Sequence, residues 1–254
     1  MAIRTSWAEG QSCILLYVRA TGLTTCYSLV ISPSSPHYAA LKAVQAFVYE
    51  DTYFDEDAIY MERNSRDFQD RIARENYNAE MLCEVLRTRR AEGPYPVGIL
   101  PVSTLLTSSS TATTNGNGSK KRKCVIKEIY YPKYMTPENY IDCMRPPSIV
   151  PTVASPGYGG LFSLTFTSLL ASAKFFDALK CYKGPSLGTN FTLACPYTIL
   201  AHYYETDWAR EWGVESGLVR VSTGLEDPAL LLEWFEEALE AAEKACEEAE
   251  SAVE

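Results

Sequence analysis

SGLVRVSTGLEDPALLLEWFEEALEAA, from Ser216 to Ala242, is the stretch that decides the fold of the second half of this chain. Its first part sets apolar residues between two glycines, which predicts a strand over residues 217–224. Asp227 and Pro228 then suit an N-cap and a first helical position, so we expect a helix over residues 228–245. A strand that leads directly into a helix is a typical unit of an α/β fold.

The expected helix has one apolar face, and glutamates cover the others. Its apolar stripe consists of Leu231, Trp234, Phe235, Ala238, Ala242 and Ala245. Beyond Ala242 the stripe contains only alanine, so we expect the acidic end to project into solvent. Eleven of the 32 acidic residues and a single lysine lie between Glu226 and Glu254. The rest of the chain is nearly neutral, so no nucleic-acid partner is expected, since that would require a basic face.

A single charged side chain, Arg220, interrupts the apolar strand. A guanidinium beside buried apolar residues is costly without a partner, and its planar fork matches a carboxylate. Two kinds of partner would satisfy Arg220: a glutamate of the protein or the carboxylate of a ligand. Taken alone, the sequence favours a structural ion pair with a nearby glutamate over the binding of a ligand's carboxylate.

Segments upstream complete the α/β pattern. CVIKEIYYP (residues 124–132) and GGLFSLTFTS (residues 159–168) predict strands, and residues 169–180 predict a helix. A long helix is expected over residues 59–90. Its apolar positions follow a helical period at Phe68, Ile72, Met81 and Val85.

Four parts of the chain differ in character. Residues 1–27 show little clear periodicity, and whether they are native to the protein is left open. Residues 28–102 form a domain junction that contains the long helix. Residues 103–123, STLLTSSSTATTNGNGSKKRK, predict a low-complexity loop. Residues 124–254 are expected to form one compact α/β domain that ends in the acidic helix.

The eight cysteines form no C-x-x-C pair and no zinc-binding spacing, and the chain has only two histidines. We therefore expect no metal site and interpret the cysteines as reduced thiols. No apolar run is long enough to span a bilayer, and no secretory signal pattern is present. A cytoplasmic location without a membrane partner is the expectation.

Three ordered segments carry a family resemblance: SPGYGGLFSLTF (155–166), KGPSLGTNFTLACPYTILAHY (183–203) and GLVRVSTGLEDPALLLEWFEEAL (217–239). Together they resemble the C-terminal part of the cystathionine γ-synthase family of transsulfuration enzymes, and most closely its fungal branch. YFDEDAIYMERNSRDF and RENYNAEMLCEVL extend the likeness upstream, so that it covers residues 28–239 outside the loop. The implied fold is α/β, the C-terminal small domain of a fold type I pyridoxal-phosphate-dependent transferase, preceded by a long linking helix.

The resemblance also implies chemistry. Family members use pyridoxal 5′-phosphate to replace the γ-substituent of an acyl-homoserine with a thiol such as cysteine. In the family pattern, a serine and an arginine at the positions of Ser186 and Arg220 hold the substrate's α-carboxylate. Because of this resemblance, we expect Arg220 to bind a ligand's carboxylate instead of forming a structural ion pair. His202 also matches a family histidine, which we interpret as structural. A homo-oligomer, or a hetero-oligomer with a related full-length enzyme, is the expected assembly.

One part of the family's machinery is missing from the sequence. The family places its cofactor lysine just before the first matched strand, where this chain has GQSCILLYVRATGLTTC (residues 10–26) without a lysine. We therefore assign no catalytic residue and no cofactor-binding residue, and we do not expect this chain alone to bind the cofactor. The expectation is a truncated, cystathionine γ-synthase-like protein that is not active alone. The alternative is a non-catalytic module that pairs with a full-length relative or holds an amino-acid carboxylate.

Overall fold

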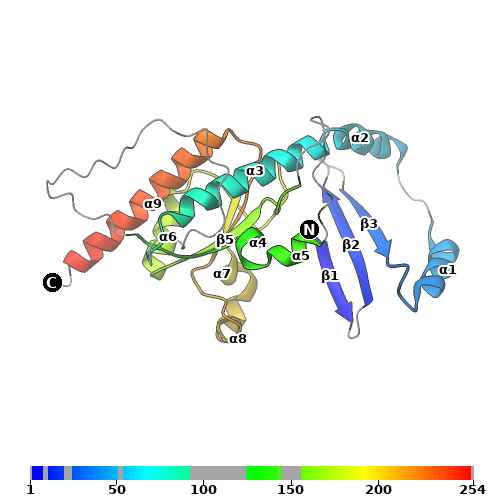
Figure 1. The fold of residues 1–254 in the computed structure, drawn as a ribbon, viewed down its shortest axis with the longest axis horizontal. Coiled ribbons are helices and arrows are strands. Elements are labelled where there is room, and N and C mark those ends of the chain that lie inside the picture. The colour runs from blue at the N-terminus through cyan, green and yellow to red at the C-terminus, as the bar shows by residue number, and fades with distance from the viewer. Residues whose placement is uncertain are drawn as a thin grey trace.

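The computed structural model describes residues 2–7, 11–19, 25–50, 54–91, 124–142, 144 and 156–252, with side chains described from residue 31 onward. Within these ranges the chain forms two sheets and a set of helices (Figure 1). The predicted loop over residues 103–123 lies outside them. None of the described helices combines the length and the apolar composition that a membrane span requires.

A five-stranded sheet forms the centre of the C-terminal half. In spatial order its strands are β4 (Ile126–Tyr130), β5 (Leu161–Phe166), β8 (Val219–Ser222), β7 (Leu193–Pro196) and β6 (Tyr182–Lys183). Neighbouring strands run antiparallel, except that β6 and β7 run parallel. All three predicted strands are confirmed, and the strand that carries Arg220 is the middle one.

Two helices pack together beside this sheet, namely α6 (Leu169–Ala178) and α9 (Pro228–Ser251). The predicted cap of α9 is confirmed, because the Asp227 carboxylate accepts a hydrogen bond of 2.9 Å from the backbone N–H of Ala229. Phe235 on α9 lies 6.1 Å from the ring of Phe162 on β5 and 5.9 Å from Phe175 on α6, measured between ring centroids. These buried rings join the sheet to both helices in one apolar core.

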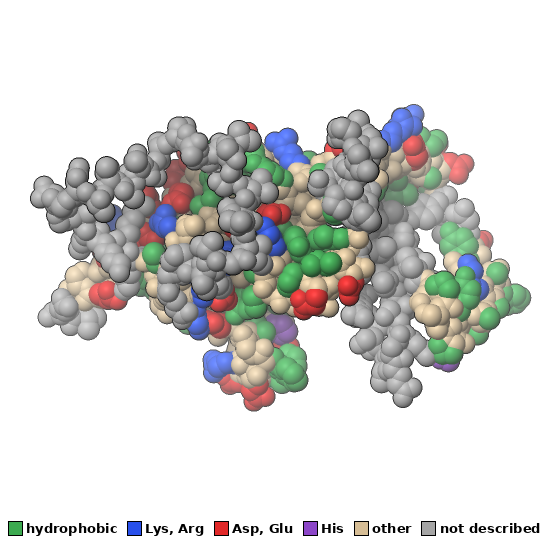
Figure 2. Space-filling model, in the orientation of Figure 1, with side chains coloured by type: hydrophobic (Ala, Val, Ile, Leu, Met, Phe, Trp, Pro, Cys, Tyr) green, Lys and Arg blue, Asp and Glu red, His purple; other side chains and the backbone are tan. Residues whose placement is uncertain are grey.

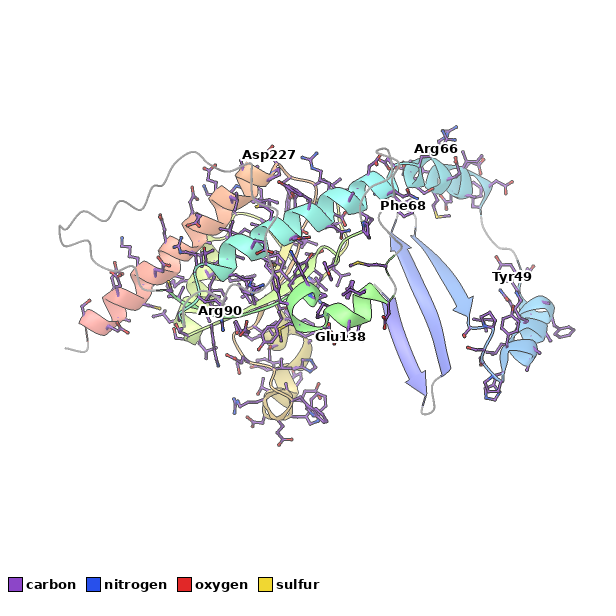
Figure 3. All side chains as sticks on the ribbon, viewed as in Figure 1. Tyr49, Arg66, Phe68, Arg90, Glu138 and Asp227 are labelled. Atoms are coloured by element: carbon purple, nitrogen blue, oxygen red, sulfur yellow. The ribbon has the colours of Figure 1, made fainter. Side chains whose placement is uncertain are left out.

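The single helix expected over residues 59–90 is instead two helices, α2 (Asp55–Ser65) and α3 (Phe68–Arg87). The labels on Arg66 and Phe68 mark their junction in Figure 3. Asp67 leaves the helical conformation there (φ −101°, ψ 10°), and its carboxylate accepts a 3.0 Å hydrogen bond from Arg71. The sequence contained a signal for this break, because aspartate is a favourable residue at a helix start. The prediction of one helix did not use that signal.

The buried face of α3 also differs from the predicted stripe. Phe68 and Ile72 are about half exposed, and Figure 1 shows the start of α3 extending past the sheet. The residues that α3 buries are Glu75, Asn78, Ala79, Leu82, Cys83 and Leu86. The four apolar ones, Ala79, Leu82, Cys83 and Leu86, follow the helical spacing i, i+3, i+4, i+7, so the sequence contained this stripe and the prediction chose a different one. The two polar ones, Glu75 and Asn78, extend the buried face beyond what apolar periodicity indicates.

The acidic end of α9 is less solvated than expected. Arg89, just after α3, donates hydrogen bonds of 2.6 Å to Glu236 and 3.0 Å to Glu243. The Glu243 side chain is 7% exposed, and Cys246 one turn later is buried. The expectation that the helix leaves the protein after Ala242 is therefore wrong for its next turn, since an arginine outside the helix balances the buried charge.

The N-terminal part forms a separate antiparallel sheet of three strands, β1 (Ala2–Trp7), β2 (Gln11–Arg19) and β3 (Thr25–Ile31). Helix α1 (Tyr38–Val48) follows it. Phe47 is 91% exposed, and α1 contains no buried residue. The segment without clear periodicity therefore holds strands that sequence inspection missed.

The cysteines with described side chains form no disulfide with one another: Cys83, Cys124, Cys181, Cys195 and Cys246. Among the described residues, no group of three possible metal ligands occurs.

A polar network surrounds the turn that ends β8. The Asn78 side-chain amide donates hydrogen bonds of 2.9 and 3.0 Å to the backbone carbonyls of Gly224 and Glu226. The Thr192 hydroxyl accepts a 3.0 Å bond from the backbone N–H of Gly224 and donates a 2.8 Å bond to the Glu226 carboxylate. Helix α3, strand β7 and the start of α9 are thus fixed to one another through this turn.

Gly224 has no room for a side chain. A Cβ atom there would lie 2.4 Å from the carbonyl carbon of Phe191 and 2.7 Å from the carbonyl oxygen of Asn190. Both neighbours are backbone atoms, which cannot rotate away. Gly184 offers a contrast, because a Cβ atom there would meet only a side-chain carbon of Leu193 at 3.7 Å.

We predict that Gly224→Ala lowers the free energy of unfolding by about 2–3 kcal/mol, since the added methyl overpacks a fixed backbone. Gly184→Ala should change it by less than about 1 kcal/mol. Urea denaturation followed by circular dichroism measures both variants. Equal stability of the two would contradict the account of this turn.

Candidate functional site

Strand alternation places Arg220 on the face of the sheet opposite the helical core. Its neighbours along β8, Val219 and Val221, are buried at 1% and 0% exposure and point to the other side. Arg220 lies between Ser163 on β5 and Cys195 on β7 in the antiparallel register. The side chain is half-buried, so its charged end remains accessible to a ligand.

The Arg220 guanidinium has three neighbours on this face. Its Nη2 donates a hydrogen bond to the backbone carbonyl of Pro185, and its Cζ lies 5.1 Å from the centroid of the Tyr197 ring. Burial raises the pKa of the Cys195 thiol, and Arg220 acts in the opposite direction. No Asp or Glu in the described part of the chain forms an ion pair with Arg220. The structure thus does not show the ion pair that the sequence alone favoured.

Ser186, the second predicted site residue, lies on an exposed loop that strand β8 holds at two points. Arg220 binds the carbonyl of Pro185, and the Ser222 hydroxyl accepts a 3.0 Å hydrogen bond from the backbone N–H of Gly188. Gly188 has a φ of +68°, a conformation that favours glycine. The two contacts fix the loop on either side of Ser186 and bring it next to the strand that carries Arg220.

His202 is part of an aromatic cluster that comprises Tyr197, His202, Trp208 and Trp212. It lies at the end of α7 (Tyr197–His202), which is followed by the 3-10 turn Tyr203–Glu205 and α8 (Thr206–Glu211). The His202 ring contacts Tyr197 at 5.7 Å and Trp208 at 6.0 Å between centroids. Its Nδ1 lies 2.7 Å from the Glu205 carboxylate. These contacts support the structural interpretation of His202.

Glu75 is a residue that sequence reasoning missed. The apolar stripe expected for the long helix does not include it, yet it is 8% exposed and packs against Gly160. Burial raises the pKa of Glu75 to about 7, and Arg71 opposes the shift. The available signal was its position three and four residues before Asn78 and Ala79, on the same helical face.

The fold is shared with transsulfuration enzymes. The cystathionine γ-synthase of Xanthomonas oryzae, solved in complex with cystathionine, aligns with a TM-score of 0.55 at 20% identity over 86% of this chain and 46% of that chain. At this identity the likeness shows the fold alone. It confirms the predicted α/β fold.

Sequence comparison then identifies the family. The cystathionine γ-synthase-like enzyme iboG2 of Amanita muscaria is 50% identical over 223 residues, which make up 86% of this chain and 31% of that enzyme. The cystathionine γ-synthase of Neurospora crassa is 39% identical over 85% of this chain and 28% of that protein. No protein-family model matches. The chain belongs to the cystathionine γ-synthase family, as its three segments predicted, and spans less than a third of these relatives.

Family enzymes depend on pyridoxal phosphate, bind amino-acid substrates and act as oligomers. To hold this cofactor, a protein of this kind requires a lysine amine that is free to bond with it. Lys183, three residues before Ser186, donates its amine to the Leu179 carbonyl at 2.5 Å and lies 4.6 Å from the centroid of the Phe176 ring. Burial lowers the pKa of Lys183, but its amine serves to close helix α6.

Most other described lysines pair with acidic side chains, namely Lys127 with Glu215, Lys133 with Glu80 and Glu84, Lys180 with Glu237, and Lys244 with Glu248. Lys42 donates a 3.1 Å hydrogen bond to Gln45, and Lys174 is exposed on α6. The candidate site described above consists of a guanidinium with an adjacent serine loop.

The raised pKa of Glu75 predicts a pH-dependent stability. Between pH 4.5, its ordinary pKa, and about pH 7, folded Glu75 retains a proton that the unfolded chain releases. Its stabilising contribution is therefore complete below pH 4.5 and is lost as pH rises through 7, by about 3 kcal/mol. Glu75→Gln should be more stable than the wild type at pH 8 and lose this advantage at pH 4.5.

Thermal unfolding at both pH values measures the difference. The exposed residue Glu211 provides the control, since Glu211→Gln should follow the wild type at each pH. A Glu75→Gln variant that tracks the wild type across this range would show that Glu75 is not buried as described.

Proposed function

We propose that this chain supplies the substrate-carboxylate half of a cystathionine γ-synthase-like active site. The observation that carries the proposal is the state of Arg220, which has a carbonyl and an aromatic ring as neighbours but no acidic partner among the described residues. A guanidinium in this state retains N–H donors for a carboxylate, and it is bidentate and always charged.

Ser186 is the second member of the proposed site. Its loop is fixed to β8 at Pro185 and Gly188, so the backbone on either side of Ser186 is held next to the strand that carries Arg220. In this arrangement Arg220 neutralises the carboxylate of an amino acid and Ser186 donates a further hydrogen bond. Together they orient the substrate and leave its reacting carbons to groups outside the chain.

The family reaction, a pyridoxal-phosphate-dependent γ-replacement on an acyl-homoserine by a thiol such as cysteine, is the activity we propose for the complete site. The cofactor would supply the electron sink for that reaction. We propose that the cofactor half comes from a further region of the same polypeptide or from a related full-length enzyme in an oligomer. The family match favours this function over a purely non-catalytic module.

We predict that the full chain binds L-cystathionine weakly through Arg220, with a Kd on the order of 1 mM, because only part of the site is present. The measurement is an NMR titration followed at the backbone amides of Gly188 and Ser222. Arg220→Ala should raise the Kd by at least about 30-fold, and Arg220→Lys by about 5- to 10-fold. Ser186→Ala should raise it by at least about 10-fold, the effect of one hydrogen bond to a charged group.

Thermal unfolding of each variant serves as the folding control. A Kd for Arg220→Ala equal to that of the folded wild type would reject the assignment of the carboxylate site.

A further inference from the structure

Tyr197 is the aromatic neighbour of the Arg220 guanidinium, and the proposed site gives it no role. Tyr197 begins α7 directly after β7, and its backbone N–H donates a 3.1 Å hydrogen bond to the carbonyl of Leu218. Leu218 lies two residues before Arg220 on the chain. The backbone of Tyr197 is therefore fixed to the entry of the same strand that carries the arginine.

Side-chain contacts restrain the Tyr197 ring, in addition to the hydrogen bond that fixes its backbone. It packs edge-to-face against His202, with 5.7 Å between centroids and 74° between planes, and His202 in turn contacts Trp208 and the Glu205 carboxylate. The Tyr197 ring is thus in contact with the rest of the aromatic cluster as well as with Arg220. Figure 1 shows α7 and α8 projecting from the sheet away from α3 and α9, so this cluster lies outside the main core.

Arg220 is consequently restrained in two directions. The Pro185 carbonyl accepts a hydrogen bond from one edge of the guanidinium, while the Tyr197 ring lies 5.1 Å from Cζ. An unrestrained arginine loses much rotamer freedom when it binds a carboxylate, and a cation held near an aromatic ring loses less. Because of these two contacts, the protein sets the direction of the remaining guanidinium N–H groups before a ligand binds.

We propose that Tyr197 is a positioning residue for Arg220: its ring orients the guanidinium toward an amino-acid carboxylate, and the aromatic cluster holds the ring in place. This inference rests on the proposed function of Arg220. It adds a residue from α7 to a site otherwise made by β8 and the Ser186 loop. Removal of the ring should weaken carboxylate binding without removing any group that touches the ligand.

The test uses the full chain and L-cystathionine as the probe. Tyr197→Leu should raise the Kd about 3- to 10-fold and shift the Arg220 Nε–H signal, because the ring current of the aromatic side chain is lost. Tyr197→Phe keeps the ring and should remain within about twofold of the wild type in Kd. Tyr204, 98% exposed in the turn after α7, provides the matched control, since Tyr204→Leu should change neither quantity.

The outcomes separate this inference from the proposed function. If Arg220→Ala weakens binding but Tyr197→Leu does not, Tyr197 has no positioning role and the carboxylate site stands. If Arg220→Ala leaves the Kd unchanged, the proposed function fails first. A Phe variant as weak as the Leu variant would also overturn the role of the ring. Should Tyr197→Leu fail to show the wild-type unfolding transition, Tyr197→Met takes its place with the same expected result.

Discussion

The turn that ends β8 organises the C-terminal half of the molecule, and the candidate site depends on it. Its glycine allows the backbone of residues 190–191 to approach within a distance that no side chain would permit. Its carbonyls and N–H groups bond Asn78 of α3 and Thr192, the residue directly before β7. Because the network fixes both the end of β8 and the segment that precedes β7, it also sets the register that brings Arg220 opposite Cys195. Loss of this turn would therefore affect stability and the site together.

The two faces of the sheet serve different purposes. One face packs against α6 and α9 through phenylalanine rings and valines, and it requires apolar side chains. The other face carries a half-buried arginine, a serine loop and a segment with exposed aromatic residues, among them Tyr204 and Trp212. Figure 2 shows hydrophobic and charged side chains side by side on that projecting segment. A single strand supplies both faces because alternate residues of β8 point in opposite directions.

Sequence reasoning succeeded where the signal is local. The alternation around Arg220 and the Asp227–Pro228 cap depend on neighbouring residues, and the ordered segments identified the family. It failed where distant residues decide the outcome. Glu75 and Asn78 are buried because α3 packs beside Gly160 and Gly224, which lie far along the chain. Glu243 is buried because Arg89 reaches it from another element. The positioning of Arg220 by Tyr197 likewise requires two strands to be paired before the contact exists.

The central claim is that the active site is divided, with the carboxylate half on this chain and the cofactor half outside it. The most direct measurement is the absorbance spectrum of the full chain with added pyridoxal phosphate, followed by borohydride reduction and peptide mapping. The account predicts no Schiff-base band and no stoichiometric adduct at one lysine, because residues 10–26, where the family resemblance expects the cofactor lysine, contain none. A single adduct in equimolar yield, for instance at Lys183 near the Ser186 loop, would contradict the division and place the cofactor on this chain.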